Sequence, residues 1–176
     1  CGGKVTSSSA YYYPNWMPDG RIIACKEYSE TTTTFWGSAP SELKYYITAL
    51  TIDDNNDVVK EENLYEVSDI VDEITCSPTG EMIGYIYDGI YITDYRGNNK
   101  SKIPGTDANL EYFDWSPDAM RLVYRDNGKN LYIIDREGTK KTLITSESYG
   151  SVAWRVGEKI IYSGLYSINS DGTAQN

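Results

Sequence analysis

One short pattern recurs along this chain and constrains its fold more than any other feature. In its best-preserved copy, Trp115 precedes the turn Ser116-Pro117-Asp118, and a short apolar strand follows at residues 122–124. Three less regular copies begin at Trp16, Cys76 and Trp154. Pro presets the backbone dihedral that such a turn needs, and Gly takes the positive one. A sequence with internal repeats of this kind predicts a fold built from repeated structural units.

The spacing of the copies sets the size of the repeated unit. Cys76, Trp115 and Trp154 follow one another at an equal interval of about 40 residues. The interval from Trp16 to Cys76 is longer by about 20 residues, which predicts an insertion at residues 31–50. Short strands separated by Gly, Asn and Asp turns fill each unit, and helical periodicity is nowhere sustained. Four short strands per unit predict the blades of a β-propeller.

The predicted fold class is therefore all-β, a propeller-like array of four blades of about 40 residues. The chain divides into a tether at residues 1–10 and a propeller-like domain at 11–176, with repeats at 11–66, 67–106, 107–146 and 147–176. The fourth repeat stops after its third strand, which leaves two arrangements open. Residues 4–6 could supply the missing outer strand and close a four-blade ring. Alternatively, the four blades are the N-terminal part of a larger propeller.

The repeat also carries a family resemblance. The Trp-Ser-Pro-Asp turn at residues 115–118, followed by Leu-Tyr-Ile-Ile-Asp at 131–135 and a Gly turn, resembles the propeller repeat of TolB and its relatives. The resemblance covers residues 11–176 and is strongest in the second and third repeats. Cys76 stands where the family pattern has Trp, and Ala119 stands where it has Gly. The resemblance implies protein–protein interaction in the cell envelope, and it assigns no partner-binding residue, because a fold alone does not specify a function.

The first residues suggest a second resemblance. Cys1 is followed by Gly2, Gly3 and a stretch rich in Ser and Thr. This resembles a mature bacterial lipoprotein, in which the first Cys carries lipid. It implies an outer-membrane lipoprotein of the bacterial cell envelope, facing the periplasm or the cell surface, with a flexible tether reaching at most ~30 Å. The alternative is that the sequence starts at a Cys without such a meaning.

Composition excludes several classes of function. A formal net charge of −10 argues against nucleic acid, because phosphates need a basic surface. The 176 residues contain no His, which removes the usual general base and the usual zinc ligand. No phosphate-binding or nucleophile-elbow motif is present. We therefore predict no catalysis, no catalytic residue, no metal and no cofactor.

The Trp and Cys residues at equivalent positions of the repeats are predicted to pack in the core. The aromatics Trp16, Trp115 and Trp154 are predicted to be wedges between blades. Cys25 and Cys76 fall at apolar strand positions and are predicted to be buried free thiols; a disulfide between them stays open, since an envelope compartment permits one.

The acidic turns are predicted to be structural as well. Asp53-Asp54-Asn55-Asn56-Asp57 begins like a calcium loop but lacks its Gly and its Glu, so it reads as a hairpin turn. The carboxylates Asp19, Asp94, Asp118 and Asp135 are predicted to cap their turns.

The insertion is the best candidate for a partner-binding surface. Phe35 and Trp36 lie in a polar context of Thr, Ser, Gly and Pro and continue no blade strand. Aromatic side chains in a long loop are common interface anchors. The alternative is that they fold back over the first blade as a local cap.

These observations predict a membrane-anchored extracytoplasmic propeller lipoprotein. It would act as a protein–protein interaction scaffold or as an accessory subunit of a larger cell-envelope complex, and it would bind other envelope proteins. Two alternatives remain: the propeller module of a larger hydrolase or peptidase, and a surface glycan-binding protein that uses exposed Tyr and Trp.

Overall fold

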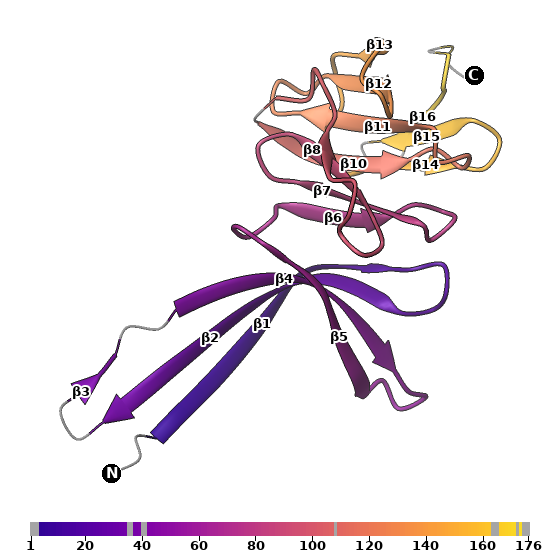
Figure 1. Cartoon of the computed structure of the whole chain (residues 1–176). Coiled ribbons are helices and arrows are strands. Elements are labelled where there is room, and N and C mark those ends of the chain that lie inside the picture. Colours follow the sequence, from indigo (N-terminus) through magenta and orange to yellow (C-terminus); the bar gives the residue numbers. More distant parts are fainter. Residues whose placement is uncertain are drawn as a thin grey trace.

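The computed structural model describes residues 4–34, 37–39, 42–107, 109–162, 166–171 and 173, and all their regular structure is β-strand. Four antiparallel sheets, which we call blades 1 to 4, follow one another along the chain (Figure 1). Within this part of the chain no helix is long and apolar enough to cross a membrane. The predicted all-β, propeller-type array of four blades is confirmed.

Neighbouring strands of each blade are also neighbours in sequence. Blade 1 consists of β1 (Lys4–Trp16), β2 (Ile22–Thr34), β4 (Glu42–Ile52) and β5 (Val58–Val67), with the short β3 (Gly37–Ser38) paired to β2. Blade 2 consists of β6 (Glu73–Cys76), β7 (Met82–Ile86), β8 (Ile90–Asp94) and β9 (Ser101–Lys102). Blade 3 consists of β10 (Leu110–Trp115), β11 (Arg121–Asp126), β12 (Leu131–Asp135) and β13 (Lys141–Thr145). Blade 4, in its described part, consists of β14 (Val152–Arg155), β15 (Lys159–Tyr162) and β16 (Tyr166–Asn169).

The repeated turn is held by its own polar side chains. The Ser116 hydroxyl lies 2.5 Å from Asp118 Oδ1 and accepts the Arg121 backbone N–H at 2.8 Å. Asp118 in turn accepts the N–H of Met120. Ala119 has φ 57°, the left-handed conformation that Gly20 and Gly80 take in the other turns. As predicted, Asp19, Asp94 and Asp135 accept backbone N–H groups of their own turns.

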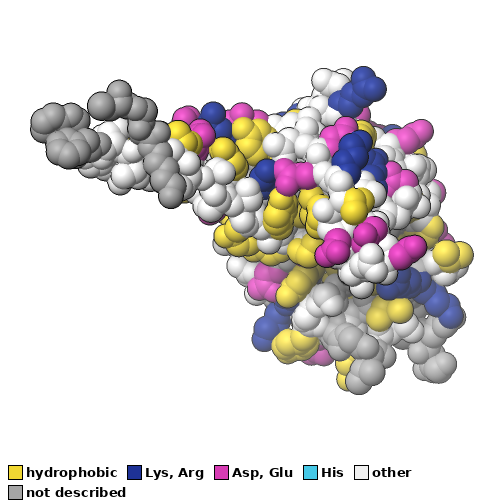
Figure 2. Space-filling view, turned by 90° about the horizontal axis from the view of Figure 1, so that it is seen from below, with side chains coloured by type: hydrophobic (Ala, Val, Ile, Leu, Met, Phe, Trp, Pro, Cys, Tyr) yellow, Lys and Arg dark blue, Asp and Glu magenta, His cyan; other side chains and the backbone are white. Residues whose placement is uncertain are grey.

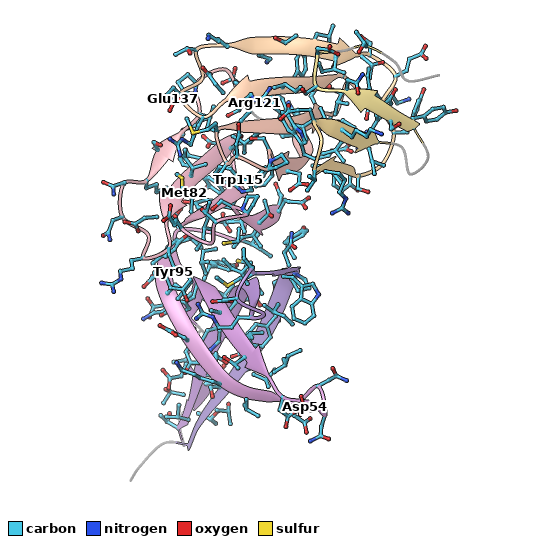
Figure 3. All side chains as sticks on the ribbon, turned by 90° about the vertical axis from the view of Figure 1, so that its right-hand side faces the viewer. Asp54, Met82, Tyr95, Trp115, Arg121 and Glu137 are labelled. Carbon is cyan, nitrogen blue, oxygen red and sulfur yellow. The ribbon has the colours of Figure 1, made fainter. Side chains whose placement is uncertain are left out.

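Adjacent blades pack face to face through three apolar clusters. Between blades 2 and 3, Phe113 and Trp115 of β10 lie against β7, and Trp115 is 2 % exposed (Figure 3). A Cβ on Gly84 of β7 would lie 2.8 Å from the Phe113 ring, so the absence of a side chain there makes room for both aromatics. The predicted wedge role is confirmed for Trp115 and for Trp154, which is 4 % exposed between blades 3 and 4.

The wedge prediction is wrong for Trp16, whose exposed fraction is 61 %. Cys76, Trp115 and Trp154 occupy the same repeat position, and each packs into the cluster shared with the preceding blade. Blade 1 has no preceding blade among the described residues, so nothing covers Trp16. The repeat pattern predicted the same burial at all four positions, but the first position lies at the end of the array, where no described blade covers it.

Among the described residues the array is open, because the first strand pairs within its own blade. Residues 4–6 pair with residues 31–33 of β2, so they do not supply an outer strand for blade 4. The first half of β1, at residues 4–10, was expected to be a flexible tether and is instead a strand paired with β2. The predicted insertion also has different limits, because residues 47–50 pair with residues 22–25 inside the blade.

The extra residues of the first repeat build a projecting arm. The first half of β1, the second half of β2 and the start of β4 run together away from the blades (Figure 1). We call residues 4–10, 27–34 and 42–45 the arm.

Both cysteines of the strands are buried free thiols, as predicted. Cys25 and Cys76 lie in the cluster between blades 1 and 2. Burial raises the pKa of Cys76 to about 11, which keeps this thiol protonated at neutral pH.

Two Trp substitutions test the open array. We expect Trp115→Ala to lower the free energy of unfolding by about 3–5 kcal/mol, because it leaves a cavity between two blades. Trp16→Ala changes the same residue type at the same repeat position, and we expect a change below about 0.5 kcal/mol because this side chain is exposed. Urea denaturation followed by circular dichroism measures both. Comparable losses for the two variants would contradict the open end at blade 1.

Candidate functional site

The first strands of the four blades line an open groove. β1 contacts β6, β6 contacts β10, and β10 contacts β14, so the strands lie side by side in chain order. Two hollows of about 500 Å³ and about 460 Å³ open along them, and Asn15 and Glu73 line both. We call this surface the inner groove; its polar and aromatic lining includes Tyr13, Asn15, Asp72, Glu73, Glu111 and Asp114.

Tyr13 is placed in the groove by a break in β1. The register of β1 on β2 shifts between Tyr12 and Asn15, and Tyr13 has φ 53°. Such a bulge turns a side chain out of the regular alternation of a strand. Tyr13 is 44 % exposed, and burial together with the negative charges of Asp72 and Glu73 raises its pKa. Its phenol therefore stays a hydrogen-bond donor beside two carboxylates.

Asp114 and Asn15 tie neighbouring blades together along the groove. Asp114 accepts the Trp115 N–H with Oδ1 and the Trp154 N–H with Oδ2, both at 2.8 Å, so it links blade 3 to blade 4. Asn15 occupies the same repeat position, accepts the Trp16 N–H at 2.8 Å and donates to the Ile74 carbonyl at 3.4 Å, which links blade 1 to blade 2.

Glu73 is the carboxylate most affected by its surroundings. Loss of water contact by burial raises its pKa to about 7, and the charge of Asp114 adds to the shift. Burial also raises the pKa of Asp114, while the two N–H groups that it accepts oppose that shift. Glu73 therefore exchanges a proton with solvent near neutral pH.

The groove has a strongly acidic lining. In the larger hollow, Asp72, Glu73 and Glu111 are the ionisable carboxylates, and no Lys or Arg lines it. In the smaller hollow, Arg155 is the single cation of the lining, and its charge opposes the rise in the pKa of Asp114. Glu111 pairs with Arg125 on the next strand. The groove therefore favours positively charged groups.

No metal site emerges from the part of the chain that the structure describes. No three His, Cys, Asp or Glu side chains among those residues come close enough to hold an ion. In the turn resembling a calcium loop, Asp53 accepts the N–H groups of Asn55 at 2.9 Å and Asp57 at 3.0 Å. The turn lies at the tip of the β4–β5 hairpin, where Figure 3 labels Asp54. This agrees with the predicted hairpin turn.

The site residues predicted from the sequence remain untested. Cys1, Phe35 and Trp36 lie outside the described residues, so lipidation and partner binding at these positions stay predictions. The inner groove was not anticipated. One signal was available: Asp72 and Glu111 stand at the same distance before Cys76 and Trp115, so a carboxylate recurs at one repeat position.

Comparison with solved structures supports the fold. No protein-family model matches this sequence, and no curated protein matches it. TolB from Acinetobacter baumannii is similar with a TM-score of 0.58 and 15% identity over 91% of this chain and 40% of that one. A puromycin-hydrolyzing peptidase from Mycobacterium tuberculosis gives a TM-score of 0.65 and 14% identity over 88% of this chain and 28% of that one.

A third structure belongs to the same group of folds. The pyranose dehydrogenase PQQ domain from Coprinopsis cinerea gives a TM-score of 0.61 and 9% identity over 92% of this chain and 48% of that one. This chain spans less than half of each of these three structures. At such identities the likeness establishes a TolB-like propeller fold and nothing about activity.

The pKa of Glu73 predicts a pH-dependent stability. Its folded-state pKa of about 7 lies above the ordinary 4.5, so its contribution is present below pH 4.5 and is lost as pH rises through 7. We expect Glu73→Gln to raise the free energy of unfolding by about 1 kcal/mol at about pH 8, a value reduced for partial solvent access. The melting temperature would then rise by about 2–4 °C at this pH and change little at about pH 5.

Thermal melts of both proteins at the two pH values check this expectation. Glu42→Gln, at an exposed position of β4, is the control and should show no difference between the two pH values. An equal effect of Glu73→Gln at both pH values would contradict the raised pKa.

Proposed function

We propose that this chain is a non-catalytic binding module of the bacterial cell envelope, whose inner groove holds a positively charged segment of a partner protein. The observation that supports this most directly is the lining of the larger hollow. Three carboxylates, of which Glu111 is paired with Arg125, line it together with Tyr13 and Tyr112, and no Lys or Arg is part of that lining.

The shape and chemistry of the groove suit a polypeptide. The inner groove is open to solvent along the first strands of the blades and is not an enclosed cavity. An extended segment can therefore enter it without unfolding the blades. Aromatic side chains supply most of the contact energy in such surfaces, while opposite charges fix register and speed association. Lys and Arg side chains can also stack on the Tyr rings.

The polar residues of the repeats favour binding over catalysis. Ser116 and Asp118, the most enzyme-like pair of the sequence, bond to each other and to the backbone of their own turn. The sequence has no His to activate a hydroxyl as a nucleophile. A role as scaffold or as accessory subunit of a larger complex needs none of this chemistry.

The envelope location belongs to the same proposal. Its supports are the resemblance of Cys1 and its neighbours to a mature lipoprotein and the fold shared with TolB. A lipid on Cys1 would anchor the chain in the outer membrane, and Phe35 and Trp36 would add a second contact with envelope partners. Intact-mass measurement of protein from its native membrane checks the lipid: an unmodified Cys1 contradicts the anchor.

Peptides of different charge test the groove. We expect synthetic peptides with a net positive charge to bind, and acidic peptides of equal length not to bind, in fluorescence anisotropy. At about pH 8, where Glu73 is mostly ionised, Asp72→Asn with Glu73→Gln should weaken binding roughly tenfold or more, because two carboxylates beside the ligand lose their charge. Added salt should weaken the wild-type interaction and affect the variant less.

A charge-matched control separates the groove from overall acidity. Asp54→Asn with Asp57→Asn removes the same charge from the exposed β4–β5 turn and should leave peptide binding unchanged. If basic and acidic peptides bind equally, or if both double variants weaken binding alike, the groove is not the binding site.

The loop residues need a separate experiment. Phe35→Ala with Trp36→Ala should reduce recovery of partner proteins from solubilised envelope, since exposed aromatics are typical interface anchors. Quantitative mass spectrometry of the recovered proteins compares this variant with wild type and with the groove variant. Unchanged recovery would show that Phe35 and Trp36 are not part of the interface.

A further inference from the structure

The first half of β1 presents a long open strand edge. Along residues 4–12 every described ladder partner of β1 lies on β2, so its other edge has no strand beside it. In the arm this edge lies away from the other blades (Figure 1). An open edge offers a row of backbone N–H and C=O groups to another strand.

This edge lacks the protection that the other first strands have. Natural proteins shield open edges with short strands, charges, Pro or bulges. β6 and β14 have four residues each and carry Glu73 and Arg155, and β10 carries Glu111 and Asp114. Residues 5–12 of β1 contain no charged residue, no Pro and no Gly. The unprotected stretch ends where Tyr13 breaks the register and Pro14 lacks an N–H.

We propose that residues 5–11 of β1 pair antiparallel with the same residues of a second copy of this chain, which joins two arms into one continuous sheet. This surface is separate from the inner groove and does not depend on the function proposed for it.

The sequence of the stretch suits pairing with itself. A two-fold axis perpendicular to the sheet must pass beside a pair of identical residues, because residues opposite each other point to the same face. An axis at Ser8 places Val5 opposite Tyr11 and Thr6 opposite Ala10, at both ends of the paired region. Aromatic and β-branched residues opposite each other are favourable cross-strand pairs. The centre brings Ser8 opposite Ser8 of the second copy and Ser7 opposite Ser9, and all three are exposed in the single chain. No like charges meet anywhere along the stretch.

The surroundings leave space for the second copy. Val5 is 52 % exposed and Tyr11 41 %, so both can be covered by a partner. In the view from below, the arm extends from the body, and the side chains of its described outer part are mostly neither charged nor hydrophobic (Figure 2). The paired stretch itself therefore places no charged side chains opposite each other.

Charge-swap variants test this pairing. Ser8→Lys with Ser9→Lys places like charges opposite each other across the two-fold axis, and so does Ser8→Asp with Ser9→Asp. We expect sedimentation velocity to show a concentration-dependent dimer for the wild type and a dimer weakened roughly tenfold or more for each variant alone. An equimolar mixture of the Lys and Asp variants should restore the dimer, which a merely structural effect would not do.

A variant on the opposite edge of the same blade is the matched control. Val58→Lys with Val59→Lys adds the same charge to exposed positions of β5 and should leave the dimer unchanged. Circular dichroism confirms that all variants are folded. A wild type that stays monomeric at every concentration overturns the proposal. So does a dimer that both Ser variants leave intact, or a monomer whose arm pairs only with an added extended peptide.

Discussion

Packing of one blade on the next is the interaction on which the rest of this structure depends. A single repeat unit cannot bury its own apolar face, so neighbouring units must stack to form a continuous core. Each blade therefore places large side chains, such as Phe113 and Trp115, against the sheet before it, and Gly84 provides the space that they fill. Three such clusters hold four blades in a row, so the loss of one contact weakens the whole array.

The same requirement explains the properties of the inner groove. Blades that pack through their faces leave their first strands side by side at one edge, and polar residues there are only partly solvated. Asn15 and Asp114 use this edge to link neighbouring blades, whereas burial and the charge of Asp114 keep the pKa of Glu73 raised. A groove that binds a basic segment would supply a positive charge, which connects its electrostatics to the proposed function.

Blade 1 differs from the others because no blade precedes it among the described residues. Its outer face retains an exposed Trp16 at a position that is buried in the other repeats. On the same face, Lys26 is nearly buried because Glu61 pairs with it and the ring of Tyr28 lies under it. The blade thus has an exposed Trp and a buried Lys that is paired with a carboxylate. Its arm adds an unpaired strand edge. These features make blade 1 the part of the described chain most suited to further assembly.

The sequence by itself determined the repeat, its length, the all-β class, the turn chemistry of Ser116 and Asp118 and the burial of Trp115, because turn geometry and strand alternation are local properties. It also located an enlarged first repeat. Only the tertiary structure decided that residues 4–10 join that enlargement as a strand, that Trp16 is exposed and that Asp72, Glu73 and Asp114 meet in one groove. These outcomes depend on which blade lies beside which. A pattern that recurs in every repeat does not show which repeat lies at the end of the array.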